Sequence, residues 1–244
     1  MDATAADAAK PAVKINTRTA ESEPDILDIR NPFLDAAVAL IDRLAARELA
    51  PARYMAEVGR LLASMDLVTM LKPWLERAMA EQRDQVLFRR TGKGHREAIQ
   101  VFYLAPNVFH PPHCHHNILS TQYMLTGRVQ MREYDRIARL SADTLLLKPV
   151  AEGWIGPGDA LRASEVDRNC HWFCSSQEPA LMLNFNAYGY QDWTFNPKDR
   201  PLLRNLVDPT HAVSPDGLPI AREISVEEAY AKFGGRPISD FPLP

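Results

Sequence analysis

The chain has 244 residues, of which 46% are hydrophobic, and a formal net charge of -3, so it can bury a substantial core. Its basic residues alternate with acidic ones and form no stripe that would neutralise a phosphate backbone, which argues against nucleic acid as a partner. No apolar run approaches the roughly 18 to 20 residues of a spanning helix, and the N-terminus lacks a signal-peptide pattern. We therefore expect a soluble, cytoplasmic protein without a membrane partner.

The N-terminal third divides into a tail and a helical region. Residues 1–24 are rich in Ala, Thr, Glu and Asp without apolar periodicity, which predicts a disordered tail. Residues 25–83 show apolar side chains at helical spacing and predict a helical cap. Its three helices are predicted to begin near Asn31, Pro51 and Asp66, and the third is predicted to kink or restart at Pro73.

The spacing of apolar residues changes from about residue 84. Eight or more short segments rich in β-branched and aromatic residues follow one another up to residue 190, separated by Gly, Pro, Asn and Asp turns. Closely spaced strands without intervening helices predict an antiparallel sandwich or barrel over 84–190. Residues 191–244 are rich in proline and predict an irregular extension packed outside the barrel, with a short helix near 226–233.

The three cysteines are Cys114, Cys170 and Cys174. An odd, sparse set fits reduced thiols better than the disulfide framework of a secreted protein. Cys114 and Cys170 each neighbour a histidine of interest, and we interpret them as small buried apolar residues.

The chemistry concentrates between His110 and Gly127, where four of the seven histidines fall within seven residues. His113 and His115 are two residues apart, so on an extended strand their side chains point the same way. Two imidazoles side by side form half of a metal site.

These residues resemble the first motif of the cupins, G(X)5HXH(X)3,4E(X)6G. His113, Cys114 and His115 supply HXH, Ser120 stands where the glutamate belongs, and Gly127 keeps the spacing, whereas the leading glycine is absent. A second, weaker cupin motif can begin at Gly158 and reach His171. The resemblance implies a mainly β fold, a single cupin (small β-barrel, double-stranded β-helix) with an N-terminal helical cap.

Within the cupins, the chain resembles the thiol dioxygenases of the cysteine dioxygenase type, which bind iron through three histidines and no glutamate. The resemblance implies His113, His115 and His171 as metal ligands. It also implies a catalytic role for Tyr188, seventeen residues after His171, where these enzymes place a tyrosine. Mammalian-type members cross-link that tyrosine to a cysteine at the position of Ser120, and they carry a histidine at the position of Asn186, so the substrate can differ.

Candidate substrate-binding residues come from the resemblance and from strand alternation. The thiol dioxygenases hold the substrate carboxylate with an arginine on an early barrel strand, the region of Arg89 and Arg90, of which only one can enter the lumen. Asn186 shares a polar strand face with Tyr188, and we expect that face to line the site. Gln122 shares the face of Ser120 and can reach the pocket or satisfy backbone groups. The full substrate-binding set is Arg89, Arg90, Asn186, Gln122 and Ser120, and the roles of His110 and His116 stay open.

Three neutral imidazoles leave the full double positive charge on a metal ion, which favours an anionic substrate atom such as a thiolate or an enolate. Iron(II) is the first choice, with nickel, manganese, copper and zinc also compatible. We therefore predict a dioxygenase that uses O2 to convert a small organic thiol with an acidic group to a sulfinate.

Two alternatives keep the fold. One is a metal-dependent dioxygenase, lyase or isomerase of a non-thiol enolisable or aromatic substrate, and the other is a metal- or ligand-binding cupin without turnover. The frequent dimerisation of cupins also leaves a homodimer open.

Overall fold

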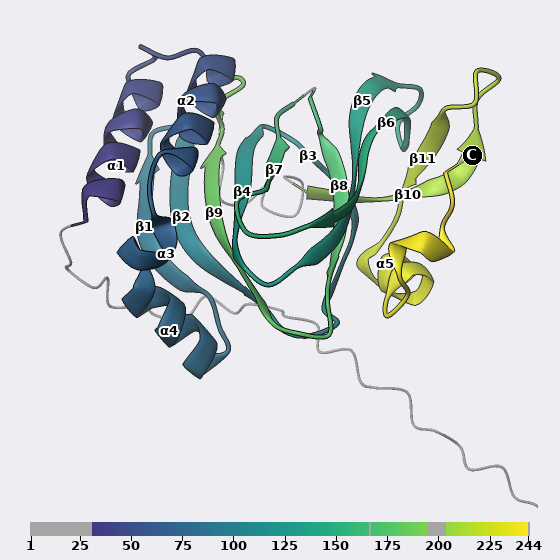
Figure 1. Ribbon diagram of the computed structural model, residues 1–244. Coiled ribbons are helices and arrows are strands. Elements are labelled where there is room, and N and C mark those ends of the chain that lie inside the picture. The colour runs from purple at the N-terminus through teal and green to yellow at the C-terminus, as the bar shows by residue number, and fades with distance from the viewer. Residues whose placement is uncertain (1–30, 166, 195–203, 244) are drawn as a thin grey trace, which may run out of the picture.

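The computed structural model describes residues 31–165, 167–194 and 204–243, and it places two antiparallel sheets face to face with helices on the outside of one (Figure 1). The tail predicted over residues 1–24 lies outside the described residues. The predicted fold class, a mainly β barrel with an N-terminal helical cap, is confirmed.

The helical cap comprises α1 (Pro32–Ala45), α2 (Pro51–Ala63), α3 (Leu67–Met70) and α4 (Lys72–Glu81). Asn31 caps α1 as predicted, because its side chain accepts a hydrogen bond from the backbone N–H of Phe33. The predicted restart at Pro73 is also confirmed, since α4 begins anew after Leu71 with the proline in its first turn.

The helix-covered sheet has the strand order β1-β2-β9-β4-β7. Its strands are β1 (Gln85–Gly92), β2 (His95–Leu104), β9 (Ala180–Tyr188), β4 (Ile118–Thr126) and β7 (Ala160–Ala163). The second sheet, which we call the histidine-bearing sheet, closes on itself in the order β10-β11-β6-β5-β8-β3. Its strands are β10 (Arg204–Val213), β11 (Pro219–Glu223), β6 (Thr144–Ile155), β5 (Val129–Arg139), β8 (Cys170–Ser175) and β3 (Phe109–His115).

Strand β9 shows why the cap and the site lie on opposite faces of the helix-covered sheet. Its alternate residues Leu181, Leu183, Phe185 and Ala187 join the core beneath the helices, where the rings of Phe33 and Phe185 meet edge to face at 6.0 Å. The intervening side chains, which include two asparagines and a tyrosine, face the other sheet. The expectation that this polar face points inward is confirmed.

The inward face of the helix-covered sheet encloses the space that we call the lumen. Apolar side chains from both sheets meet there, Met124 and Met182 from one side and Met131 and Phe173 from the other. The lumen therefore has an apolar floor, and the polar residues of β4 and β9 lie beyond that floor.

The C-terminal extension is more regular than predicted. Strands β10 and β11 complete the ring of the histidine-bearing sheet, and α5 (Val226–Phe233) covers an apolar core on the face of that sheet away from the lumen. The predicted helix is confirmed, with Ser225 and Glu228 forming a capping box. The irregular character expected of 191–244 is wrong for these strands, because proline and polar residues are tolerated where a strand pairs along only part of its length.

Candidate metal centre

Neighbouring strands of the histidine-bearing sheet bring three histidines together. His113 on β3 lies directly opposite His171 on β8, and His115 follows two residues later on the same face of β3. One ring nitrogen of each histidine lies within 4.8 Å of the others, and Nε2 of His115 is 3.3 Å from Nε2 of His171.

The ring orientations leave the Nε2 atoms for a shared ligand. Nδ1 of His113 lies 2.8 Å from the carbonyl oxygen of Pro111, so Nδ1 carries the proton and donates it, while Nε2 keeps its lone pair. For metal–nitrogen bonds of about 2.1 Å, the separation of the other two Nε2 atoms corresponds to an angle of about 100° at the ion. The three residues can therefore hold one metal ion.

Burial keeps this cluster uncharged. It lowers the pKa of His113 to about 4, with a contribution from the positive charge of Arg204. The pKa values of His115 and His171 also lie well below their usual range, chiefly through burial and then through the neighbouring histidines and Arg204. At neutral pH all three rings are neutral, which is the form that binds a metal.

A disulfide between Cys114 and Cys170 links the two strands that carry the histidines. The prediction that these two cysteines are unpaired thiols is therefore wrong, although both are buried as expected and Cys174 is free. The two residues are 56 positions apart, and only the register of β3 against β8 shows that they lie opposite each other.

Ser120 and Asn186 lie next to each other on the lumen face of the helix-covered sheet. Ser120 Oγ donates a hydrogen bond of 2.7 Å to Oδ1 of Asn186, and both side chains are buried. Strand pairing places Ala98 and Ala163 on either side of them. Ser120 is thus engaged with a neighbouring side chain.

Tyr188 also lies on the lumen face, and its partner there is an arginine that the sequence analysis missed. Arg96 pairs with Tyr188 in the strand register, and its guanidinium carbon lies 4.5 Å from the centre of the tyrosine ring. The alternation of β2 could have identified this arginine, because Ile99 and Val101 face the helices and residues of the opposite parity face the lumen.

Arg90 does not enter the lumen, which corrects one of the two predicted positions. Its side chain binds Asp42 of α1 at 2.6 Å and Glu97 at 3.3 Å on the cap side of the sheet. Arg89 has the opposite orientation, in register with Ala98, but its side chain is exposed on edge strand β1.

Two buried amides lie side by side on the lumen face of β4 and β9. Gln122 pairs in register with Asn184, and neither Gln122 Oε1 nor Asn184 Oδ1 has a hydrogen-bond partner among the described residues. Gln122 was predicted as a site residue, and the alternative that its amide serves the backbone receives no support from its side-chain oxygen.

The two other histidines of the cluster have different surroundings. The ring of His110 stacks on Phe173 at 4.4 Å, and burial lowers its pKa to about 3. His116 is exposed, with Nδ1 3.5 Å from Glu165. His110 therefore belongs to the lumen wall, and His116 lies outside the group formed by His113, His115 and His171.

Glu133 is a second residue that sequence reasoning missed. It is fully buried, pairs in register with His171 and forms an ion pair with Arg168, and burial raises the pKa of its carboxyl group. Its approach to the histidine depends on the pairing of β5 with β8, and no motif in the sequence indicates it.

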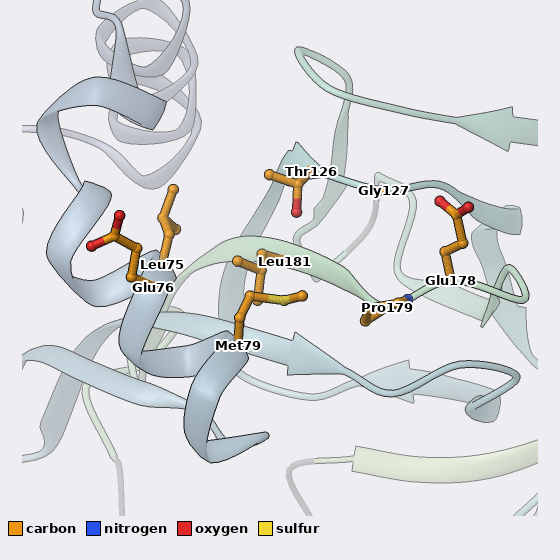
Figure 2. Close-up of a pocket in the computed structure, with 8 residues that line it drawn as sticks. All are labelled: Leu75, Glu76, Met79, Thr126, Gly127, Glu178, Pro179 and Leu181. Carbon is orange, nitrogen blue, oxygen red and sulfur yellow. The ribbon is translucent and has the colours of Figure 1, made fainter.

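A groove of about 500 Å³ lies elsewhere, between α4 and the ends of β4 and β9 (Figure 2). Leu75, Met79 and Leu181 form its apolar part, and the carboxylates of Glu76 and Glu178 lie on opposite sides of it. It contains none of the candidate site residues, and we assign it no role. None of the helices within the described ranges has the length and apolar character of a membrane span.

Fold and site together define a β-barrel with an N-terminal helical cap and a candidate three-histidine metal centre. No protein-family model matches this chain, and no curated protein matches its sequence. Among solved structures, similarity is found to a protein with a double-stranded β-helix domain from Klebsiella pneumoniae, at 15% identity and a TM-score of 0.30, covering 43% of this chain and 75% of that one. A cupin superfamily protein from Desulfitobacterium hafniense has 13% identity and a TM-score of 0.29, covering 42% and 72%.

The coconut allergen cocosin is also similar, at 15% identity and a TM-score of 0.31, covering 41% of this chain. The match spans only 28% of the cocosin chain. The fold class of this chain rests on its own strand pairing.

Proposed function

We propose that this protein is a non-haem iron(II) dioxygenase that oxidises a small organic thiol with an acidic group to a sulfinate. The observation that carries the proposal is the convergence of three buried, neutral histidines in a lumen where Ser120 replaces the expected carboxylate ligand. Such a donor set leaves the charge of a divalent ion uncompensated and favours an anionic sulfur ligand. Bound iron(II) would supply the place where thiolate and O2 react, with both oxygen atoms transferred to sulfur.

The chain's own residues provide binding and orientation in this proposal. Arg96 replaces Arg90 as the arginine that holds the acidic group, since its guanidinium stacks on Tyr188 at the lumen face. The Tyr188 hydroxyl then orients the substrate beside the histidines. Arg89, at the exposed edge of the same face, remains the alternative carboxylate ligand.

The test begins with iron content and oxygen uptake. Protein loaded anaerobically with iron(II) should bind one ion and consume one O2 for each sulfinate formed from an acidic thiol. His113→Ala should lose the iron. Arg96→Gln should raise KM about tenfold or more for an acidic thiol and much less for a neutral one. The cap-side variant Arg90→Gln is the control, and any change in its KM should be the same for both thiols. Retention of stoichiometric iron by His113→Ala, or absence of oxygen uptake with every thiol in the panel, would overturn the proposal.

A second candidate function is a metal-dependent dioxygenase, lyase or isomerase that acts on a non-thiol enolisable acid. The buried carboxylate of Glu133, in register with His171, favours it because a desolvated carboxylate with a raised pKa is suited to general acid–base work. Product analysis separates the two, since only the first yields a sulfinate, and Glu133→Gln should abolish only the second.

A further inference from the structure

The lumen contains two polar side chains that metal binding by the histidines does not require. Gln122 is 4% exposed and Asn184 is 3% exposed, and the side-chain oxygen of each lacks a hydrogen-bond partner in the described part of the chain. Buried side-chain amides are normally satisfied, because an unpaired polar group in the interior is costly. Two such groups opposite each other in one strand pair indicate a position where a partner molecule binds.

The depth of these amides places them level with the histidines. On β8, His171 precedes Phe173 by two residues, and Phe173 packs in the apolar floor with Met182 of β9. Asn184 follows Met182 by two residues, and the two strands belong to facing sheets. The pair Gln122 and Asn184 therefore lies one step above the floor, as His171 does, and faces the histidines across the lumen.

The amides differ in chemistry from the arginine near Tyr188. Each amide offers both a donor and an acceptor and carries no charge, and rotation of the terminal group exchanges the two. Such a pair suits a carboxamide or a hydroxyl group, which also donates and accepts. It gives a carboxylate no compensating charge, and the side chains of Met124 and Met182 one step deeper are apolar.

We infer that Gln122 and Asn184 form a subsite for an uncharged hydrogen-bonding group, a carboxamide or a hydroxyl, on the ligand that binds at the histidines. The inference deepens the proposed function and rests on it, since it concerns a ligand held at the same centre. It predicts that the preferred ligand has such a group close to its metal-binding atom.

Two thiols of matched shape provide the probe. Mercaptoacetamide and 2-methylpropane-1-thiol have the same skeleton, and only the first has an amide. Protein loaded with cobalt(II) reports thiolate binding through a charge-transfer band, independently of turnover. Because the thiol of mercaptoacetamide is the more acidic of the two, the amide-to-alkyl affinity ratio is compared between proteins, and it should be about tenfold higher or more in the unmodified protein than in Asn184→Leu or Gln122→Met. The control variant is Gln130→Met, which changes a side chain of β5 that points away from the lumen. It should leave the ratio unchanged.

Melting of the metal-free variants gives a second measurement. Asn184→Leu and Gln122→Met should melt at the same temperature as the unmodified protein or higher, because each removes a buried polar group without a partner. A lower melting temperature for both would show that the amides support the fold, and it would overturn the inference. An amide-to-alkyl affinity ratio that is the same in the unmodified protein and in both variants would also overturn it while leaving the proposed function intact. Failure of the protein to bind cobalt(II), or of both thiols to give the band, would instead count against the proposed function, and the melting temperatures would still decide the role of the amides.

Discussion

The two faces of the helix-covered sheet treat buried polar groups in opposite ways. On the cap side, Glu97 is fully buried, and both of its oxygens have partners. Nδ1 of His95 lies 2.6 Å from one oxygen, the Tyr190 hydroxyl donates to the same oxygen, and Nε of Arg90 donates to the other at 3.3 Å. On the lumen side, the buried amide oxygens of Gln122 and Asn184 have no partner among the described residues.

This contrast separates polar groups that maintain the fold from those that await a ligand. Strand β2 shows the two faces at adjacent positions, since Glu97 points toward the helices and Arg96 stacks on Tyr188 on the opposite face. A satisfied buried charge anchors the cap to the sheet. An unsatisfied buried amide destabilises the free protein and is retained for another reason.

Removal of the cap-side carboxylate should have the largest effect. Glu97→Ala leaves His95 and Tyr190 without their buried acceptor, whereas Arg90 keeps Asp42, and the loss of these hydrogen bonds costs about 2 to 3 kcal/mol. The free energy of unfolding, measured with urea, should fall by that amount, while metal binding by the folded fraction should persist. A loss below about 1 kcal/mol would show that Glu97 does not anchor the cap.

The lumen histidines should make the metal-free protein sensitive to pH. The pKa values of His113, about 4, and His110, about 3, lie below the value of about 6.5 in an unfolded chain. Between these limits the unfolded chain binds protons that the folded protein does not, so stability falls as the pH decreases from 6.5 toward 4. Each histidine contributes at most about 1.4 kcal/mol per pH unit.

Urea unfolding of metal-free protein at pH 7, 6 and 5 measures this dependence. His110→Phe keeps a ring stacked on Phe173 and removes one titrating group, so its stability should decline less steeply. If the stability of this variant depended on pH in the same way as that of the unmodified protein, the pKa of His110 would not be lowered by folding.

The sequence predicted those features that depend on local pattern. The capping of α1 by Asn31, the inward polar face of β9 and the shared face of His113 and His115 follow from spacing along a single element. The motif spacing with Gly127 grouped only His113 and His115, and His171 was added by the resemblance to the cupins.

Apart from Arg96, which the alternation of β2 could have identified, the features that were missed depend on pairing between distant strands. Cys114 meets Cys170, and Glu133 meets His171, only because β8 lies between β3 and β5. The position of Arg90 was ambiguous because a bulge in β1 after Val86 sets which of two adjacent arginines faces the helices. Strand register of this kind is a tertiary property that periodicity alone does not define.

The smallest predicted effect concerns the lumen pair that is satisfied. Ser120→Ala removes the donor to Asn186 Oδ1 and so converts a paired buried amide into an unpaired one, at a cost of about 1 to 2 kcal/mol. The adjacent Thr121 faces the helices, where its hydroxyl lies 3.9 Å from the sulfur of Met55, a weak contact. Thr121→Val should therefore cost less than about 0.5 kcal/mol.

Urea unfolding of the two variants on neighbouring positions of β4 compares the faces directly, and metal content tests the site. Ser120→Ala should retain the full metal content, because the three histidines alone form the donor set and the serine hydroxyl is committed to Asn186. If Ser120→Ala lost metal while its fold was retained, the hydroxyl would have to act as a fourth ligand. The charge argument for a thiolate substrate would be unaffected, since a neutral hydroxyl adds no charge, but the open position for O2 would have to come from elsewhere in the coordination sphere.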